Sequence, residues 1–362
     1  MQTESGIKKS RRSRARSLGV VAAICVALIV AGSAKWLWWT EQHPEQEREL
    51  RLLVQERLEE WFPEQMTLPD DLIGFIPRSQ RFSDEHPPQV LLLHGLDEPG
   101  GIWDEMVDAL DEAGVNAWEF RFPNDQAIDH STDLMVEYWA KLDSERPLIL
   151  IGHSMGGLVI RDFITRWRHP AKDAPRITGA PVTGVILVGV PNQGSEWARL
   201  RVWLEIREWI GDIQQQRFSL FAGLRDGTGA AKIDLRPDSA FLADLNARPW
   251  PEQVDMKIIG GVLTEPTPEM TESVGALTEQ LGIEGRADEL HRLWETAGTS
   301  LGDGVVPVES LVLADQPEPL VLEASHRGLL VKMPWSDEEP PAIAPVTQTV
   351  SEWLEKGNAG EP

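Results

Sequence analysis

Three residues far apart in the chain have the types that acyl transfer by serine requires. Ser154 lies in the segment Gly-His-Ser-Met-Gly-Gly (152–157), a G-x-S-x-G pattern with apolar runs on both sides. Glycines beside a serine permit a turn too sharp for larger side chains, and a helix that starts there directs free N–H groups toward the serine. The pattern therefore predicts a nucleophile at Ser154. The alternative is a glycine-rich strand-to-helix turn without chemistry.

A serine hydroxyl needs a general base, and the base needs a group that orients it. Of the eight histidines, His326 is the best candidate for the base, because it follows the last predicted strand. Asp303, between two glycines, is the best candidate for the acid, and the order serine, acid, histidine is the one expected when a G-x-S-x-G serine follows a strand. The alternatives are a loop histidine and a plain Asp-Gly turn. Rival acids lie nearer the ends of earlier strands: Glu196, Asp234 and Asp255.

Attack on an ester carbonyl also needs N–H donors for the oxyanion that forms. Met155 follows the nucleophile directly, so its N–H is the first candidate donor. The second should come from the loop after the first strand of the body, at His94-Gly95-Leu96. Gly95 permits close approach of the backbone there, and we expect the N–H of Leu96 to be the second donor.

An alternation of strands and helices, beginning near residue 86, must position these residues. Short apolar runs predict strands at 90–93, 116–122, 148–151, 182–188, 256–261 and 320–322. Periodic apolar positions predict helices at 103–113, 132–142, 158–167 and 346–354. Buried strands that alternate with helices are typical of an α/β fold, a mostly parallel sheet with helices on both faces.

Two stretches interrupt this alternation and are too long for plain loops. The first, residues 191–251, contains a broad apolar helix face between Trp197 and Ile213, placed after a strand end. It is interpreted as an inserted cap over the site, and the alternative is a helix that simply packs on the body. The second, residues 264–300, is an insertion with one helix expected near 287–296.

The N-terminal segment has the pattern of a membrane anchor. Residues 1–17 form a basic arm, and residues 18–34 carry no charge. A helix over 18–39 would be about 33 Å long, enough for a bilayer core of roughly 30 Å. The basic arm before it and the tryptophans at its end favour a transmembrane segment with the catalytic body outside the cytoplasm. The alternative is a cleaved signal peptide, because Gly-Ser-Ala at 32–34 resembles a cleavage site.

A helical linker is expected between the anchor and the catalytic body, over residues 40–85. Apolar residues at helical spacing predict a helix over 45–62, and the proline-containing stretch 63–88 is expected to be irregular.

Composition excludes several classes of protein. The chain has 58 acidic and 34 basic residues, and residues 1–35 alone carry a net charge of +6, so the remainder is strongly acidic. Such a body argues against a nucleic-acid partner. Cys25 is the single cysteine, which excludes a disulfide within the chain and a metal site built on cysteine.

The motifs together resemble a known family. The segments that carry the likeness are His-Gly at 94–95, Gly-His-Ser-Met-Gly-Gly at 152–157, Val-Pro-Asn-Gln-Gly-Ser at 190–195, the stretch 234–246 and Gly-Asp-Gly-Val-Val-Pro at 302–307. They are similar to the α/β-hydrolase fold, and within it to bacterial lipases and to serine esterases related to GPI inositol-deacylase. The resemblance covers about residues 86–356.

The resemblance implies a role for each site residue. Ser154 would be the nucleophile, Asp303 the acid and His326 the base, with Leu96 and Met155 as oxyanion donors. Relatives of this kind need no organic cofactor, and no convincing calcium loop is visible, so no metal is expected. In place of the usual aromatic or small residue beside the last histidine stands Arg327, which makes the edge of the pocket charged.

We therefore expect a membrane-anchored serine hydrolase that cleaves carboxylic esters through an acyl-enzyme. Its partners would be a lipid or acyl-ester substrate and the membrane that holds its N-terminal segment. Two alternatives remain open at this point. One is an acyltransferase that uses the same three residues, and the other is a non-catalytic, membrane-anchored binding module.

Overall fold

The computed structural model describes most of the catalytic body and the segment before it. Described are residues 32, 35–36, 38–69, 72–83, 85–96, 101–142, 146–171, 173–196, 227–264, 302–334, 336 and 338–359. The chain divides into two compact units, Met1–Leu50 and Arg51–Pro362. Most of the expected anchor, the middle of the expected cap and most of the second insertion lie outside the described residues. Within the described part, no helix has the length and apolarity needed to cross a membrane.

A seven-stranded sheet forms the centre of the described body, in the order β1-β3-β2-β4-β5-β6-β7. All neighbouring strands are parallel except β1, which pairs antiparallel with β3. The strands are β1 (Gly74–Pro77), β2 (Val90–Leu93), β3 (Ala117–Arg121), β4 (Leu148–His153), β5 (Val182–Val188), β6 (Asp255–Val262) and β7 (Leu320–Glu323). The predicted parallel α/β sheet is thus confirmed.

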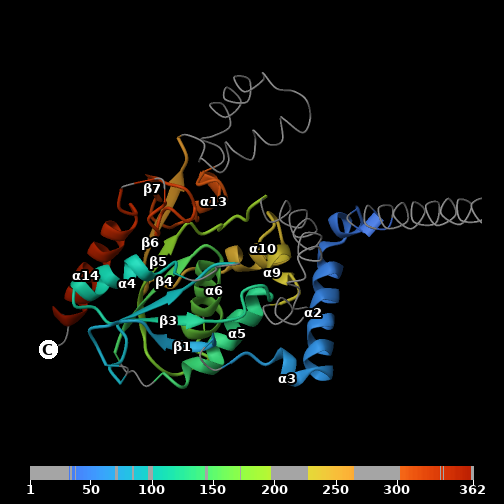
Figure 1. Cartoon of the computed structure of the whole chain (residues 1–362), viewed down its shortest axis with the longest axis horizontal. Helices are drawn as coiled ribbons and strands as arrows, with labels where there is room; N and C mark the ends of the chain where they lie inside the picture. The colour runs from blue at the N-terminus through green and yellow to red at the C-terminus, as the bar shows by residue number, and fades with distance from the viewer. Residues whose placement is uncertain are drawn as a thin grey trace, which may run out of the picture. The chain divides into compact units, whose positions relative to one another are not determined.

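Helices cover both faces of this sheet (Figure 1). The helices of the described residues are α2 (Pro44–Trp61), α3 (Pro63–Met66), α4 (Asp104–Glu112), α5 (Ile128–Trp139), α6 (Met155–Asp162), the π-helical η2 (Phe163–Arg168), α9 (Ala230–Asp234), α10 (Ala240–Ala247), α13 (Val308–Leu311) and α14 (Ile343–Ala359). Side chains of α4 and α14 build the core on one face, and side chains of α5, α6, η2 and α10 build the core on the other.

Burial on both faces explains why the sequence of strand β2 carries no polar residue. Leu91 and Leu93 point into the core beneath α5 and α6, whereas Val90 and Leu92 point into the core beneath α4 and α14. All four side chains are fully buried. A strand covered on both faces must be apolar at every position, which is the pattern of a central parallel strand.

Strand β1 lies in the proline-containing stretch 63–88, whose sequence predicts irregular structure. It forms because Phe75 packs on Phe120 of the neighbouring β3, with the ring centroids 5.1 Å apart. Gly74 begins it with a φ of 94°, and a side chain there would collide with the ring of Tyr138. The strand depends on contacts with residues far along the chain, which no local pattern announces.

Helix α5 begins at Ile128, four residues before the predicted start, for a similar reason. The backbone N–H of Ile128 donates to Oδ2 of Asp234 over 2.9 Å, so a residue from a distant segment satisfies this helix end. The residue at the N-cap position, Ala127, has no side chain that accepts such a bond.

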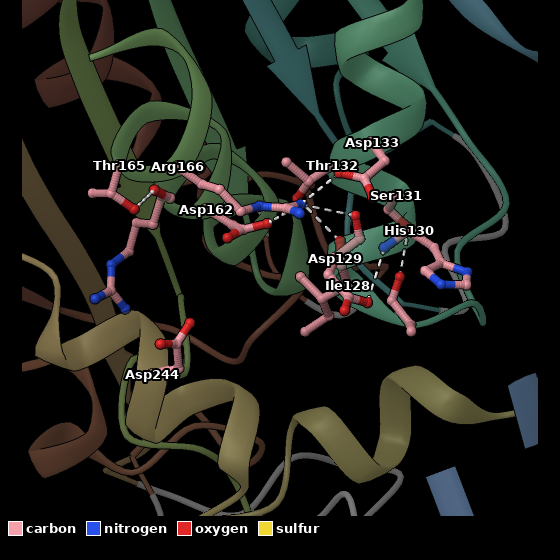
Figure 2. A network of polar contacts seen from close by, with 12 residues as sticks. Ile128, Asp129, His130, Ser131, Thr132, Asp133, Asp162, Thr165, Arg166 and Asp244 are labelled. Carbon is pink, nitrogen blue, oxygen red and sulfur yellow. Dashed lines mark hydrogen bonds and ion pairs between the residues drawn. The ribbon is translucent and has the colours of Figure 1, made fainter. Parts of the chain in front are cut away.

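Arg166 of η2 fastens the helices of this face to one another. Its Nη2 lies 2.7 Å from carboxylate oxygens of both Asp133 and Asp162, and it donates to the backbone oxygen of Asp129 over 3.1 Å. Figure 2 shows Arg166 between α5, which carries Asp129 and Asp133, and the end of α6, which carries Asp162. Asp162 also accepts from Arg248, just after α10, over 2.5 Å. This network holds α6, and with it the helix end beside Ser154, against its neighbours.

Candidate active site

Ser154 stands at the sharp turn between β4 and α6. Its φ is 52° and its ψ is −128°, a left-handed backbone that a residue with a side chain adopts only under strain. Glycines make the turn possible through close packing. A Cβ at Gly152 would lie 2.5 Å from the Cα of Gly157, and a Cβ at Gly156 would lie 2.3 Å from the backbone oxygen of Leu93. The expected turn is therefore present, and its geometry requires glycine on both sides.

His326 and Asp303 meet although 23 residues separate them. The Nδ1 of His326 lies 2.7 Å from Oδ2 of Asp303, and the backbone N–H of His326 donates to the backbone oxygen of Asp303 over 2.9 Å. A carboxylate only accepts hydrogen bonds, so Nδ1 of the neutral imidazole carries the proton and Nε2 presents a lone pair. Nε2 is then the nitrogen that can accept a proton.

The carboxylate of Asp303 is held from its other side by backbone donors. The side chain is fully buried, and its Oδ1 accepts from the N–H groups of Val305 over 2.9 Å and Val306 over 2.7 Å. These bonds compensate the loss of water around a buried charge. They also fix which oxygen is left to face His326.

The turn after β5 lies between the serine and the His–Asp pair. The N–H of Ser154 donates to the backbone oxygen of Val188 over 3.0 Å. A Cβ at the next residue, Gly189, would lie 3.2 Å from Cε1 of His326 and 3.4 Å from Oδ2 of Asp303. The structure thus brings all three predicted residues to the carboxyl edge of the sheet around one glycine.

The rival acids have other places or partners. Asp234 is the carboxylate that satisfies the start of α5, and Asp255 begins β6 at the opposite edge of the sheet. Glu196 is exposed, and it is the last residue of the described segment 173–196. Of the candidates named from sequence, Asp303 is the one whose carboxylate contacts His326.

Met155 and the loop that carries Leu96 both lie next to the turn at Ser154. Met155 is the first residue of α6, so its N–H has no acceptor within the helix. On the opposite side, a Cβ at Gly95 would lie 2.8 Å from Cβ and 3.3 Å from Oγ of Ser154, so the loop after β2 touches the serine side chain. Leu96 continues this loop and is half-buried.

One further residue beside the site has no role predicted from the sequence. His153, the last residue of β4, is buried, and its ring centroid lies 4.6 Å from that of His326. The signal that could have drawn attention to it is its position next to the nucleophile.

Two further observations concern metal ligands and a cleft outside the site. Among the described residues, no group of three or more His, Cys, Asp or Glu side chains is arranged to hold a metal ion. A wide cleft of about 1100 Å³ lies away from the serine, near the amino end of β6, with Arg161, Trp250 and Trp353 in its wall. Neither Ser154 nor His326 lines this cleft.

Comparison with known families identifies the fold. The sequence model of the family described as "Alpha/beta hydrolase family" matches residues 90–344. The chain belongs to this family. The resemblance that the motifs suggested is thereby confirmed at the level of family and fold.

Solved structures similar to this chain include two lipases and a structure from work on carboxylesterases. The lipase of Staphylococcus hyicus superposes with a TM-score of 0.51 at 12% identity, over 78% of this chain and 99% of that lipase. Mature lipase BlEst2 of Bacillus licheniformis gives 0.48 at 15% identity, over 76% and 97% of the two chains. A structure from work on carboxylesterases of Nitrososphaera gargenis gives 0.45 at 13% identity, over 78% and 95%. No curated protein sequence matches this hydrolase-family chain.

Proposed function

We propose that this chain is a serine hydrolase that cleaves carboxylic esters through a covalent acyl-enzyme. The observation that carries the proposal is the strained Ser154 at the strand-to-helix turn, on the same sheet edge as the His326–Asp303 hydrogen bond. A serine held in this conformation costs stability, and such strain is found where a side chain must be presented for function. Membership in the alpha/beta hydrolase family supports the same assignment.

The proposed reaction uses the protonation states that the hydrogen bonds impose. Nε2 of His326 takes the proton from Oγ of Ser154 as Oγ attacks the ester carbonyl carbon, and Asp303 stabilises the imidazolium that forms. The N–H groups of Met155 and Leu96 bind the oxyanion of the tetrahedral intermediate. Its collapse breaks the bond to the leaving alkoxide, which takes the proton from His326 and departs as the alcohol. Water then attacks the acyl-enzyme with His326 as base, which releases the acid and restores the serine.

We propose lipids or other acyl esters as the substrate class. The support is the apolar stretch between Trp197 and Ile213 in the expected cap, a suitable wall for an acyl chain. The test is hydrolysis of p-nitrophenyl esters with acyl chains of two to sixteen carbons. Higher kcat/KM for long chains would support the proposal, and a strong preference for the shortest would contradict it. Product analysis with an added alcohol would reveal an acyltransferase.

We further propose that residues 18–39 anchor the protein in a membrane, with the catalytic body outside the cytoplasm. The support is the uncharged run of residues 18–34 between a basic arm and a tryptophan cluster. Protease protection in spheroplasts, with intact-mass measurement of the mature N-terminus, tests the proposal. A mature protein that begins after Ala34 would contradict the anchor and indicate a cleaved signal peptide.

The nucleophile is tested by Ser154→Ala in the full chain. We expect loss of ester hydrolysis and of labelling by a fluorophosphonate probe, because the probe forms a bond only with an activated serine. Ser83→Ala, which changes an exposed loop serine, is the matched control and should keep both activities. Labelling that persists in the Ser154→Ala protein would refute the assignment.

A further inference from the structure

His153 joins the strand that carries the nucleophile to the loop that carries the candidate base. Its Nε2 lies 3.3 Å from the backbone oxygen of His326. A carbonyl oxygen can only accept, so Nε2 must carry the proton and donate. This fixes the tautomer of His153, with the proton on Nε2 and a lone pair on Nδ1. Nδ1 is buried and has no hydrogen-bond partner in the described part of the chain.

His326 is thereby held at three points. Asp303 binds its backbone N–H and its Nδ1, and both of these bonds come from the loop after β6. His153 binds the backbone oxygen, and this bond comes from β4, one residue before Ser154. The two Asp303 bonds orient the imidazole within its own loops. The third bond ties the main chain of His326 to the strand that leads to the serine.

The surroundings keep the ring of His153 neutral. Burial lowers the pKa of His153 well below its ordinary value, and positive charge on the neighbouring His326, Arg327 or His94 acts in the same direction. The hydrogen bond to the His326 backbone raises this pKa, but it does not outweigh burial. A neutral ring can lie against His326 while that residue takes up a proton, whereas a charged ring would repel the imidazolium.

We propose that His153 is a positioning residue, which holds the main chain of His326 at the distance from Ser154 that proton transfer requires. This inference rests on the proposed hydrolase function. A reacting group displaced by about 1 Å can cost about 100-fold in rate. Loss of the His153 bond should therefore lower kcat rather than raise KM, because it changes the position of the base and leaves the surface that binds substrate intact.

A pair of amide variants separates positioning from mere support. In His153→Gln the side-chain N–H₂ reaches about as far as Nε2 and can still donate to the His326 oxygen. In His153→Asn the amide is one methylene shorter and cannot reach it. His153→Phe keeps a ring of similar shape without any donor. Each full-length variant is titrated with a fluorophosphonate, so that kcat is expressed per reactive serine, and its thermal unfolding is measured.

We expect His153→Asn and His153→Phe to lower kcat per reactive site about 10- to 100-fold, with KM changed by less than about twofold. His153→Gln should recover most of the lost rate. Wild-type kcat per site in the Asn and Phe variants would overturn the inference. So would equal losses in all three variants, accompanied by lower unfolding temperatures, since these indicate a packing role. Failure to label Ser154 in the wild-type protein would instead overturn the proposed function, and this inference with it.

Discussion

Replacing Asp303 by asparagine removes one charge from the candidate triad and leaves its size unchanged. The orientation of the new amide follows from the two backbone donors that hold Oδ1. Because the N–H groups of Val305 and Val306 both point at this oxygen, the amide oxygen of the introduced asparagine should take its place. The amide N–H₂ then occupies the position of Oδ2, 2.7 Å from Nδ1 of His326. An N–H donor there forces Nδ1 to be the acceptor and moves the imidazole proton to Nε2.

A histidine protonated on Nε2 cannot take a proton from Ser154. We expect kcat to fall by about 10⁴-fold, the loss found when a triad aspartate is changed to asparagine. At about 1.36 kcal/mol for each factor of ten, this corresponds to about 5 kcal/mol of transition-state stabilisation. KM should change little, because the carboxylate is buried and does not face the substrate.

The assay is ester hydrolysis by the full chain at neutral pH, with the preferred p-nitrophenyl ester and with the rate of fluorophosphonate labelling as a second readout. Asp315→Asn is the matched control, because it makes the same chemical change at an exposed position and should keep wild-type rates. A kcat for Asp303→Asn within about tenfold of wild type, at wild-type unfolding temperature, would refute the tautomer argument and the role given to this carboxylate.

Two further predictions concern stability. Asp162→Asn should lower the free energy of unfolding by about 3–5 kcal/mol, because its buried carboxylate compensates two guanidinium groups, whereas Asp133→Asn at the half-exposed end of the same network should cost less than about 1 kcal/mol. If urea titrations showed equal losses of the free energy of unfolding in the two variants, this interpretation would be wrong. Burial lowers the pKa of His169 to about 4, and its Nε2 accepts from the N–H of Val182. The unfolded chain therefore binds a proton that the native state excludes, and stability should decline as the pH falls from about 6.5 toward 4, by at most about 3 kcal/mol from this residue. His169→Gln keeps an acceptor without titrating, so its stability should depend less on pH, and an unchanged dependence would exclude His169 as a source.

Most of the elements and the candidate chemical groups follow from local sequence. The run Pro147-Leu-Ile-Leu-Ile predicts a buried strand, and the glycines around Ser154 predict the turn, because both depend on side chains within a few residues. The order of Ser154, Asp303 and His326 could also be recognised, because serine, acid, histidine is the order expected when a G-x-S-x-G serine follows a strand. Local periodicity likewise placed α2, α4 and α14.

Tertiary structure alone decided the contacts that join distant segments. β1 exists because Phe75 meets Phe120, and α5 starts early because Asp234 reaches its first N–H group. His153 stood beside the nucleophile in the sequence, but its bond to a residue 173 positions away became visible only in the folded chain. The physical reason is the range of the forces. Strand, helix and turn preferences act between neighbouring residues, whereas hydrogen bonds and packing act between any atoms that the fold brings within a few ångströms.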